Sequence, residues 1–198
     1  MNNDVQRGPT MARNTLKALV KRGGNRWRIA AWTTATLVLL LPLIAMQFTD
    51  EVAWEVTDFV IFGALLVGTG VAFELASRKS GNTAYKTGVG VALAAVFLLI
   101  WVNGAVGIIG NEGNDANLMF YGVLAVGFIG ALIARFEPQG MARAMIATAG
   151  AQVLVFVIAL LAGWGFTGLI TLFFLAFWFV SARLFQTAAR GGPERNAV

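Results

Sequence analysis

The side chains that could do chemistry gather in one short stretch of this chain. Residues 110–117 read GNEGNDAN, in which Glu112, Asn114, Asp115 and Asn117 supply carboxylate and amide oxygens. Oxygen ligands of this kind suit a hard cation such as calcium. Their spacing is not that of an EF-hand loop, however, and ordinary turn formation and helix capping explain the same residues. In that interpretation Asn114, Asp115 or Asn117 caps the helix that follows.

Two polar residues outside this stretch are predicted to complete an outer-side polar cluster with it. Asp58 begins an apolar segment, and Asn103 lies seven residues before Gly110. Seven residues of helix are about two turns, or roughly 10 Å. We therefore expect Asp58 and Glu112 on the rim of a pocket and Asn103 at its floor. Such a pocket would bind a cation, a polar solute or a basic residue of a partner.

Other kinds of chemistry are excluded because the chain has no histidine and no cysteine. Disulfides, thiol redox chemistry, Cys/His zinc sites and His-ligated haem all need one of these residues. The usual general base is absent as well. We expect no metal and no cofactor, and an enzyme would have to use carboxylates, with Asp58 and Glu112 as the candidates.

The composition of the chain indicates an integral membrane protein. Of its 198 residues, 58% are hydrophobic and only 13% are charged. A soluble domain carries roughly a quarter charged residues. The apolar residues form six long runs, each of roughly 17–24 residues, which is enough to cross a hydrocarbon core of about 30 Å. The runs are 29–48, 57–77, 87–110, 117–134, 144–162 and 166–182.

These runs predict an all-α, polytopic transmembrane bundle of about six helices at 29–184. A basic tail at 1–28 precedes it and a C-terminal tail at 185–198 follows it. Only Gly163, Trp164 and Gly165 separate the last two runs. We expect a tight turn there, because a single span does not need so many residues. The alternative is one broken helix and five crossings.

The positions of the basic residues predict the orientation of the bundle. With six crossings and the N-terminus inside, the four inside segments hold seven, three, two and three Lys and Arg residues, which is all fifteen in the chain. Loops on the cytoplasmic side are enriched in Lys and Arg. Both termini are therefore expected to be cytoplasmic. The net charge of +5 thus reflects membrane topology, and no nucleic-acid partner is expected.

The basic tail has two interpretations. Residues 10–22 could form a short amphipathic helix with Arg13, Lys17 and Lys21 on its polar face. Such a helix would lie on anionic lipid. Alternatively, the tail is disordered and only sets the topology.

Small residues recur at helical spacing within the runs. Gly127 and Ala131 are four residues apart in the fourth run, and the second run holds the longer row Ala64, Gly68, Ala72 and Ala76. Small residues at this spacing let helices approach closely in lipid, either within one bundle or in a homo-oligomer or larger membrane complex.

A possible duplication relates the second and fourth runs. At an offset of 59 residues, Asp58 aligns with Asn117 and Gly68 with Gly127. The alignment suggests a tandem hairpin repeat in parallel orientation. The alternative is a chance match of two glycine-rich helices.

Two polar residues lie inside apolar runs, where such residues are costly and often functional. Glu74 has Arg78 four residues further on, so an ion pair along the helix would satisfy it. Gln152 lies near the middle of the fifth run. An amide there most often hydrogen-bonds another helix, and a role in a solute pathway is the alternative.

Two motifs resemble a family of multi-pass bacterial inner-membrane proteins that has no established activity. They are WVNGAVGIIGNEGNDANLMF at 101–120 and ALIARFEPQGMA at 131–142, and the resemblance covers about residues 54–163. The family has Asn-Pro where this chain has Asn114-Asp115, which alters the turn at that point. The resemblance implies a location in the bacterial inner membrane and no particular reaction.

The sequence favours three functions in a definite order. The first is a non-enzymatic structural, accessory or assembly component that acts through helix contacts. The second is a small-solute transporter or channel, which the hairpin repeat favours but the lack of charge deep in the bilayer does not. The third is a membrane enzyme that uses carboxylates.

Overall fold

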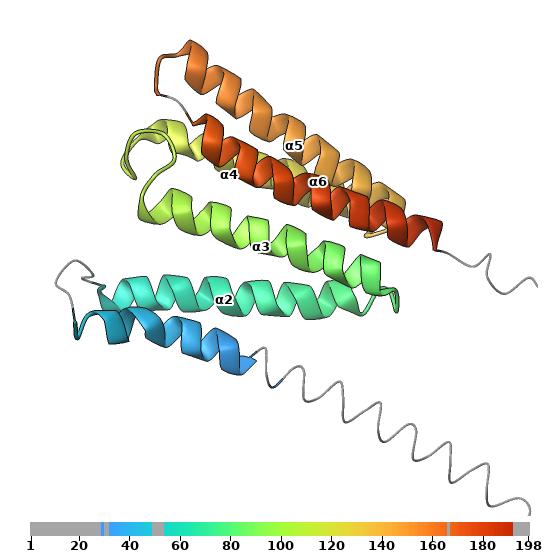
Figure 1. Ribbon diagram of the computed structural model, residues 1–198, viewed down its shortest axis with the longest axis horizontal. Helices are drawn as coiled ribbons and strands as arrows, with labels where there is room; N and C mark the ends of the chain where they lie inside the picture. Colours follow the sequence, from blue (N-terminus) through green and yellow to red (C-terminus); the bar gives the residue numbers. More distant parts are fainter. Residues whose placement is uncertain (1–28, 30–31, 49–53, 166, 192–198) are drawn as a thin grey trace, which may run out of the picture. The chain divides into compact units, whose positions relative to one another are not determined.

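The computed structural model of the chain describes residue 29 and residues 32–48, 54–165 and 167–191. All regular elements within these ranges are helices (Figure 1). The chain forms two compact units, residues 1–64 and 65–198, and the boundary falls within helix α2 (Val56–Ser77). The predicted tail at 1–28, with its amphipathic helix, lies outside the described residues.

Five of the helices are long and apolar enough to cross a membrane. They are α2, α3 (Thr83–Ala105), the 3-10 helix η1 (Asp115–Leu118) together with α4 (Met119–Ile133), α5 (Pro138–Leu161) and α6 (Gly168–Arg190). A shorter apolar helix spans Trp32–Ala45. The predicted fold class, an all-α multi-pass membrane bundle of about six helices, is confirmed.

The last two helices are separate, as the glycine pair between them predicts. Gly163 and Gly165 have φ values of +69° and +108°, which reverse the chain between α5 and α6. Such values suit glycine and few other residues. The alternative of a single broken helix at this point is wrong.

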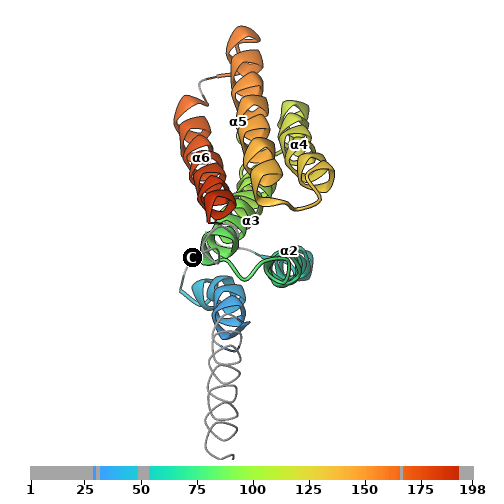
Figure 2. The same cartoon turned by 90° about the vertical axis from the view of Figure 1, so that its right-hand side faces the viewer.

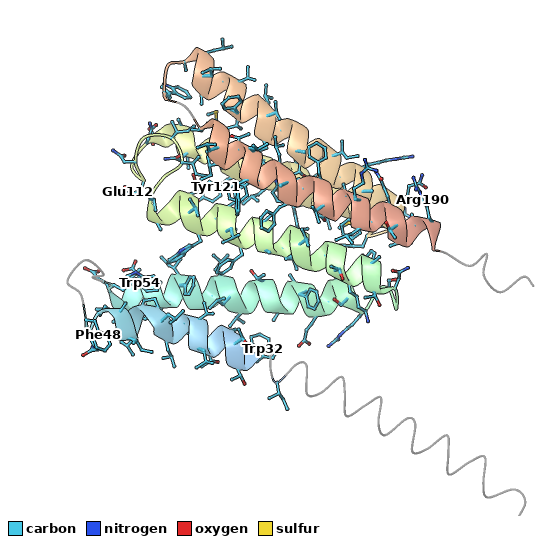
Figure 3. The ribbon with its side chains drawn as sticks, viewed as in Figure 1. Trp32, Phe48, Trp54, Glu112, Tyr121 and Arg190 are labelled. Carbon is cyan, nitrogen blue, oxygen red and sulfur yellow. The ribbon has the colours of Figure 1, made fainter. Side chains whose placement is uncertain are left out.

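The first unit is held together by aromatic and aliphatic contacts. The ring of Trp54 meets Phe59 and Phe62 edge-on, with centroid distances of 5.2 and 5.4 Å. The methyl groups of Leu39 lie 3.8 Å from where a Cβ would stand on Gly63. The helix Trp32–Ala45 therefore packs on the first turns of α2. Trp54 covers the start of α2 (Figure 3).

In the second unit, α5 packs between α4 and α6, and α6 packs on α3 (Figure 2). We call the end that carries residues 106–114 the loop end of this unit. The opposite end, where Arg78, Lys86, Arg143 and Arg190 lie, is the basic end. Figure 3 shows Glu112 at the loop end and Arg190 at the basic end.

Small residues create the close helix contacts of this unit. A Cβ on Gly130 would stand 2.8 Å from the Cβ of Ala144, and one on Gly127 would stand 2.9 Å from the hydroxyl of Thr148. Between α3 and α6, a Cβ on Gly88 would lie 3.3 Å from the ring of Phe185. Backbones that approach this closely gain dispersion contacts that replace the hydrophobic effect in lipid.

The surroundings of the predicted small-residue row of α2 differ from those of the small residues of α4. A Cβ on Gly68 would meet nothing within 4 Å among the described residues, whereas its partner in the predicted repeat, Gly127, meets Thr148. Ala64 is exposed, Ala72 and Ala76 are half-buried, and Ala131 of α4 belongs to the core. The repeat and the role of the α2 row remain predictions.

The helix ends do not coincide with the ends of the apolar runs, because polar capping residues and glycines determine where a helix begins and ends. The α3 helix begins at Thr83, four residues before the run, since the side chain of Asn82 accepts from the N–H groups of Ala84 and Tyr85 at 2.8 and 3.3 Å. It ends at Ala105 rather than at 110, because Gly107 and Gly110 have φ values of +74° and +71°.

Candidate functional site

The loop after α3 is built around the side chain of Asn117. Its amide oxygen accepts from the N–H groups of Ile108 and Ile109 at 3.0 and 2.8 Å. Its amide nitrogen donates to the carbonyls of Ile109 and Asn111 at 3.2 and 2.7 Å. One buried side chain thus satisfies two donors and two acceptors of the loop backbone, the full capacity of an amide.

Asn103 supports the same arrangement from α3. It is 4% exposed, and its amide nitrogen donates to the carbonyl of Asn117 at 3.1 Å. The sharp turn between the two residues needs glycine at position 107, where a Cβ would stand 2.3 Å from the backbone of Asn111. Asn103 is thus buried inside the protein, where it anchors the loop backbone through Asn117; its place at the floor of a pocket remains a prediction.

The remaining amides of the loop make local contacts. Asn114 accepts from the N–H of Ala116 at 2.9 Å and so caps η1, which leads into α4; the N-cap of α4 itself, Leu118, makes no side-chain bond. Asn111 accepts from the N–H of Gly113 at 3.1 Å. A cation would need these oxygens, and backbone N–H groups already occupy them. Among the described residues, no three acidic side chains lie close enough to hold a metal ion.

The carboxylates of the predicted cluster are divided between the two units of the chain. Glu112 and Asp115 are exposed at the loop end. Asp58 belongs to α2 in the first unit, where its carboxylate accepts from the N–H of Glu55 at 2.8 Å. The predicted approach of Asp58 to Glu112 therefore remains a prediction.

Of the two intramembrane polar residues, Glu74 behaves as expected. Its carboxylate lies 3.7 Å from the guanidinium of Arg78, one helical turn further on. This pair is at the basic end of α2 and is partly exposed, so it contributes little to stability. It satisfies Glu74 near the membrane surface.

Among the described residues, Gln152 does not make the contact that its sequence position predicts, a hydrogen bond to another helix. It is fully buried, and neither its amide nitrogen nor its amide oxygen has a hydrogen-bond partner within the described part of the chain. The expected hydrogen bond to another helix is not formed there. The cost of an unsatisfied buried polar group makes Gln152 the strongest candidate for an unexplained function.

Sequence reasoning did not single out three further residues of this kind on α6 and the turn before it. Thr167, Thr171 and Trp178 are buried, and their polar atoms also lack partners among the described residues. Their spacing of four and seven residues places them on one helix face. That spacing is visible in the sequence and could have identified these three residues.

Comparison of the chain with protein-family models, with curated proteins and with solved structures finds no match in any of the three. The functional argument therefore depends on the residues themselves.

Proposed function

We propose that this chain is a non-enzymatic component of the bacterial inner membrane, with both termini in the cytoplasm, that acts through contacts between its helices and those of other chains. The main support is the use of the loop amides. Asn103, Asn114 and Asn117 hold the loop backbone in place, and the amide oxygens of Asn114 and Asn117 already accept hydrogen bonds from backbone N–H groups.

The surroundings of Gly68 on α2 support a role in assembly. Gly68 has open space beside it among the described residues, and the exposed side chains around it include Val67 and Val71. Small residues flanked by branched ones at this spacing are typical of helix interfaces in lipid. In α4 the same kind of residue, Gly127, is already used within the chain.

Purification from native membranes in mild detergent tests this proposal. We expect a stoichiometric complex, which Gly68→Leu disrupts without lowering the melting temperature of the isolated chain. Gly122→Leu is the control, because Gly122 on α4 also has nothing within 4 Å. A homogeneous monomer from native membranes, or a complex that Gly68→Leu leaves intact, would contradict the proposal.

A second function, passage of a small uncharged solute, is favoured by Gln152. A fully buried amide near the middle of a membrane helix, with no partner among the described residues, is the kind of group that lines a polar pathway. Uptake by proteoliposomes that contain the purified chain would test it. Uptake equal to that of protein-free vesicles would dismiss this function.

A further inference from the structure

The turn between α4 and α5 holds two residues in a backbone conformation that their side chains disfavour. Arg135 and Phe136 have φ values of +50° and +61°. The other positive-φ residues in the described part of the chain are all glycines. A side chain with a Cβ crowds the backbone in this left-handed region, whereas glycine does not. The chain has 23 glycines, yet it carries an arginine at this position, where glycine would fit better.

The backbone of this turn ends α4 in a common way. The N–H of Phe136 donates to the carbonyl of Ala131 at 3.1 Å, and the N–H of Arg135 donates to the carbonyl of Leu132 at 2.9 Å. These two bonds form the Schellman motif, in which the residue after the helix cap is usually glycine. The hydroxyl of Tyr85 on α3 fixes the turn by donating to the carbonyl of Phe136 at 2.8 Å. The bonds that form the turn therefore need positive φ at position 135, but they need no arginine side chain.

The ring of Phe136 joins this turn to the loop between α2 and α3. The ammonium group of Lys79 lies 5.9 Å from the centroid of that ring, in a cation–π contact. Lys79 and Arg135 are both exposed. Neither makes an ion pair with a residue that the structure describes. Two cations, one from each loop, are thus held near Phe136 without an anionic partner among those residues.

The carboxylates of the second unit do not neutralise these two cations. In its described part, Glu112 and Asp115 lie at the loop end, which leaves Glu74 and Glu137 at the basic end. Glu74 pairs with Arg78 at 3.7 Å. Glu137 is exposed at the N-cap of α5. Seven Lys and Arg residues face these two carboxylates at the basic end, so an anion is attracted to it.

The depth of the two cations in the membrane identifies that anion. Lys79 lies two residues after the apolar run 57–77, and Arg135 directly follows the run 117–134. The ends of these runs mark the edge of the hydrocarbon core, and the headgroup layer adds roughly 5–7 Å beyond it. Lipid phosphates lie in that layer, and Arg and Lys are the side chains that bind phosphate in proteins. A soluble partner would meet cations further from the core.

We propose that Lys79 and Arg135 bind the phosphate of an anionic phospholipid, and that this contact is the reason for an arginine at a position that favours glycine. Basic pockets at the ends of transmembrane helices bind such headgroups. On the last turn of α4, Leu132 and Ile133 are 49% and 78% exposed and offer apolar surface to the acyl chains. The site does not depend on the assembly role proposed above, since its partner is a lipid and not another chain.

Native mass spectrometry of the full chain in detergent, titrated with phosphatidylglycerol or phosphatidylcholine, tests this proposal. We expect tighter binding of phosphatidylglycerol, which Arg135→Gln and Lys79→Gln should each weaken by about fivefold, the effect of one basic residue near an anionic surface. Arg143→Gln is the matched control, because Arg143 directly precedes another apolar run and should not affect binding. Equal binding of the two lipids, an equal loss in Arg143→Gln, or displacement of the lipid by equimolar inorganic phosphate overturns the proposal.

Thermal unfolding of Arg135→Gly supplies a second, independent readout. In detergent without added lipid, this variant should melt no lower than the parent protein, because glycine adopts positive φ at no steric cost. Phosphatidylglycerol should raise the melting temperature of the parent by mass action, and should raise that of Arg135→Gly by less. A lower melting temperature of Arg135→Gly without lipid would mean that the arginine acts within the chain, which contradicts the proposal. An equal rise with phosphatidylglycerol in both proteins would contradict it as well.

Discussion

Asn117 and Gln152 carry the same amide group, and the fold uses it in opposite ways. The amide of Asn117 makes four hydrogen bonds to the loop backbone, whereas that of Gln152 makes none among the described residues. The sequence marks both as polar residues that need an explanation. It does not distinguish them, because the partners of Asn117 are backbone atoms six to nine residues away. They come within reach only when Gly107 and Gly110 adopt positive φ.

Replacement of Asn117 tests its structural role. Asn117→Ala should lower the free energy of unfolding by about 3 kcal/mol, because it leaves buried N–H and carbonyl groups of the loop unpaired. Thermal unfolding in detergent measures the loss. Glu112→Ala, on the exposed part of the same loop, should change stability by no more than about 0.5 kcal/mol. If the two variants melt at the same temperature, Asn117 does not hold the loop.

At the scale of the helices, the apolar runs predict α2 to α6 but not where each helix ends. A run of apolar residues marks the part of a helix that lipid or core covers, and the polar ends have no such signal. The α5 helix thus begins at Pro138, six residues before its run, with proline in its first turn. The α6 helix continues to Arg190, eight residues past its run, and buries Phe185 and Ala188.

Packing contacts were also only partly predictable at this scale. The spacing of small residues identifies helices that can approach closely, but it does not say which partner covers them. Gly127 meets Thr148 of α5, while Gly68, in an equivalent pattern, meets nothing among the described residues. The two patterns look alike in sequence, and only the tertiary arrangement separates them.

The contact between α4 and α5 can be tested at Gly130. Gly130→Ala should destabilise the bundle by about 1–3 kcal/mol, because the new methyl group would stand 2.8 Å from the Cβ and 3.3 Å from the Cα of Ala144. No side-chain rotation can move these atoms away. Gly122→Ala on the same helix has open space and should be neutral or slightly stabilising, since alanine favours helix over glycine. Equal melting temperatures in detergent would mean that α4 and α5 do not pack at Gly130.

At the scale of the whole molecule, the distribution of charged residues in the structure follows the distribution that the sequence predicts. In the second unit, the alternating directions of α3 to α6 bring Lys86, Arg143 and Arg190 to one end and the loop with Glu112 to the other (Figure 3). Charge distribution was predictable because each basic residue flanks an apolar run. Which end faces the cytoplasm depends on the membrane and not on the fold, so it remains a prediction from the distribution of Lys and Arg.

Single cysteines can decide the orientation, because the chain has none of its own. Glu112→Cys places a thiol on the exposed loop, and Gly81→Cys places one between α2 and α3, where a Cβ meets nothing within 4 Å. With an impermeant thiol reagent added to intact cells, we expect Glu112→Cys to be labelled and Gly81→Cys to be protected, because basic loops stay on the cytoplasmic side. After the cells are opened, both should react equally, which controls for local reactivity. Labelling of Gly81→Cys alone in intact cells would reverse the orientation, and labelling of both would mean that α3 does not cross the membrane.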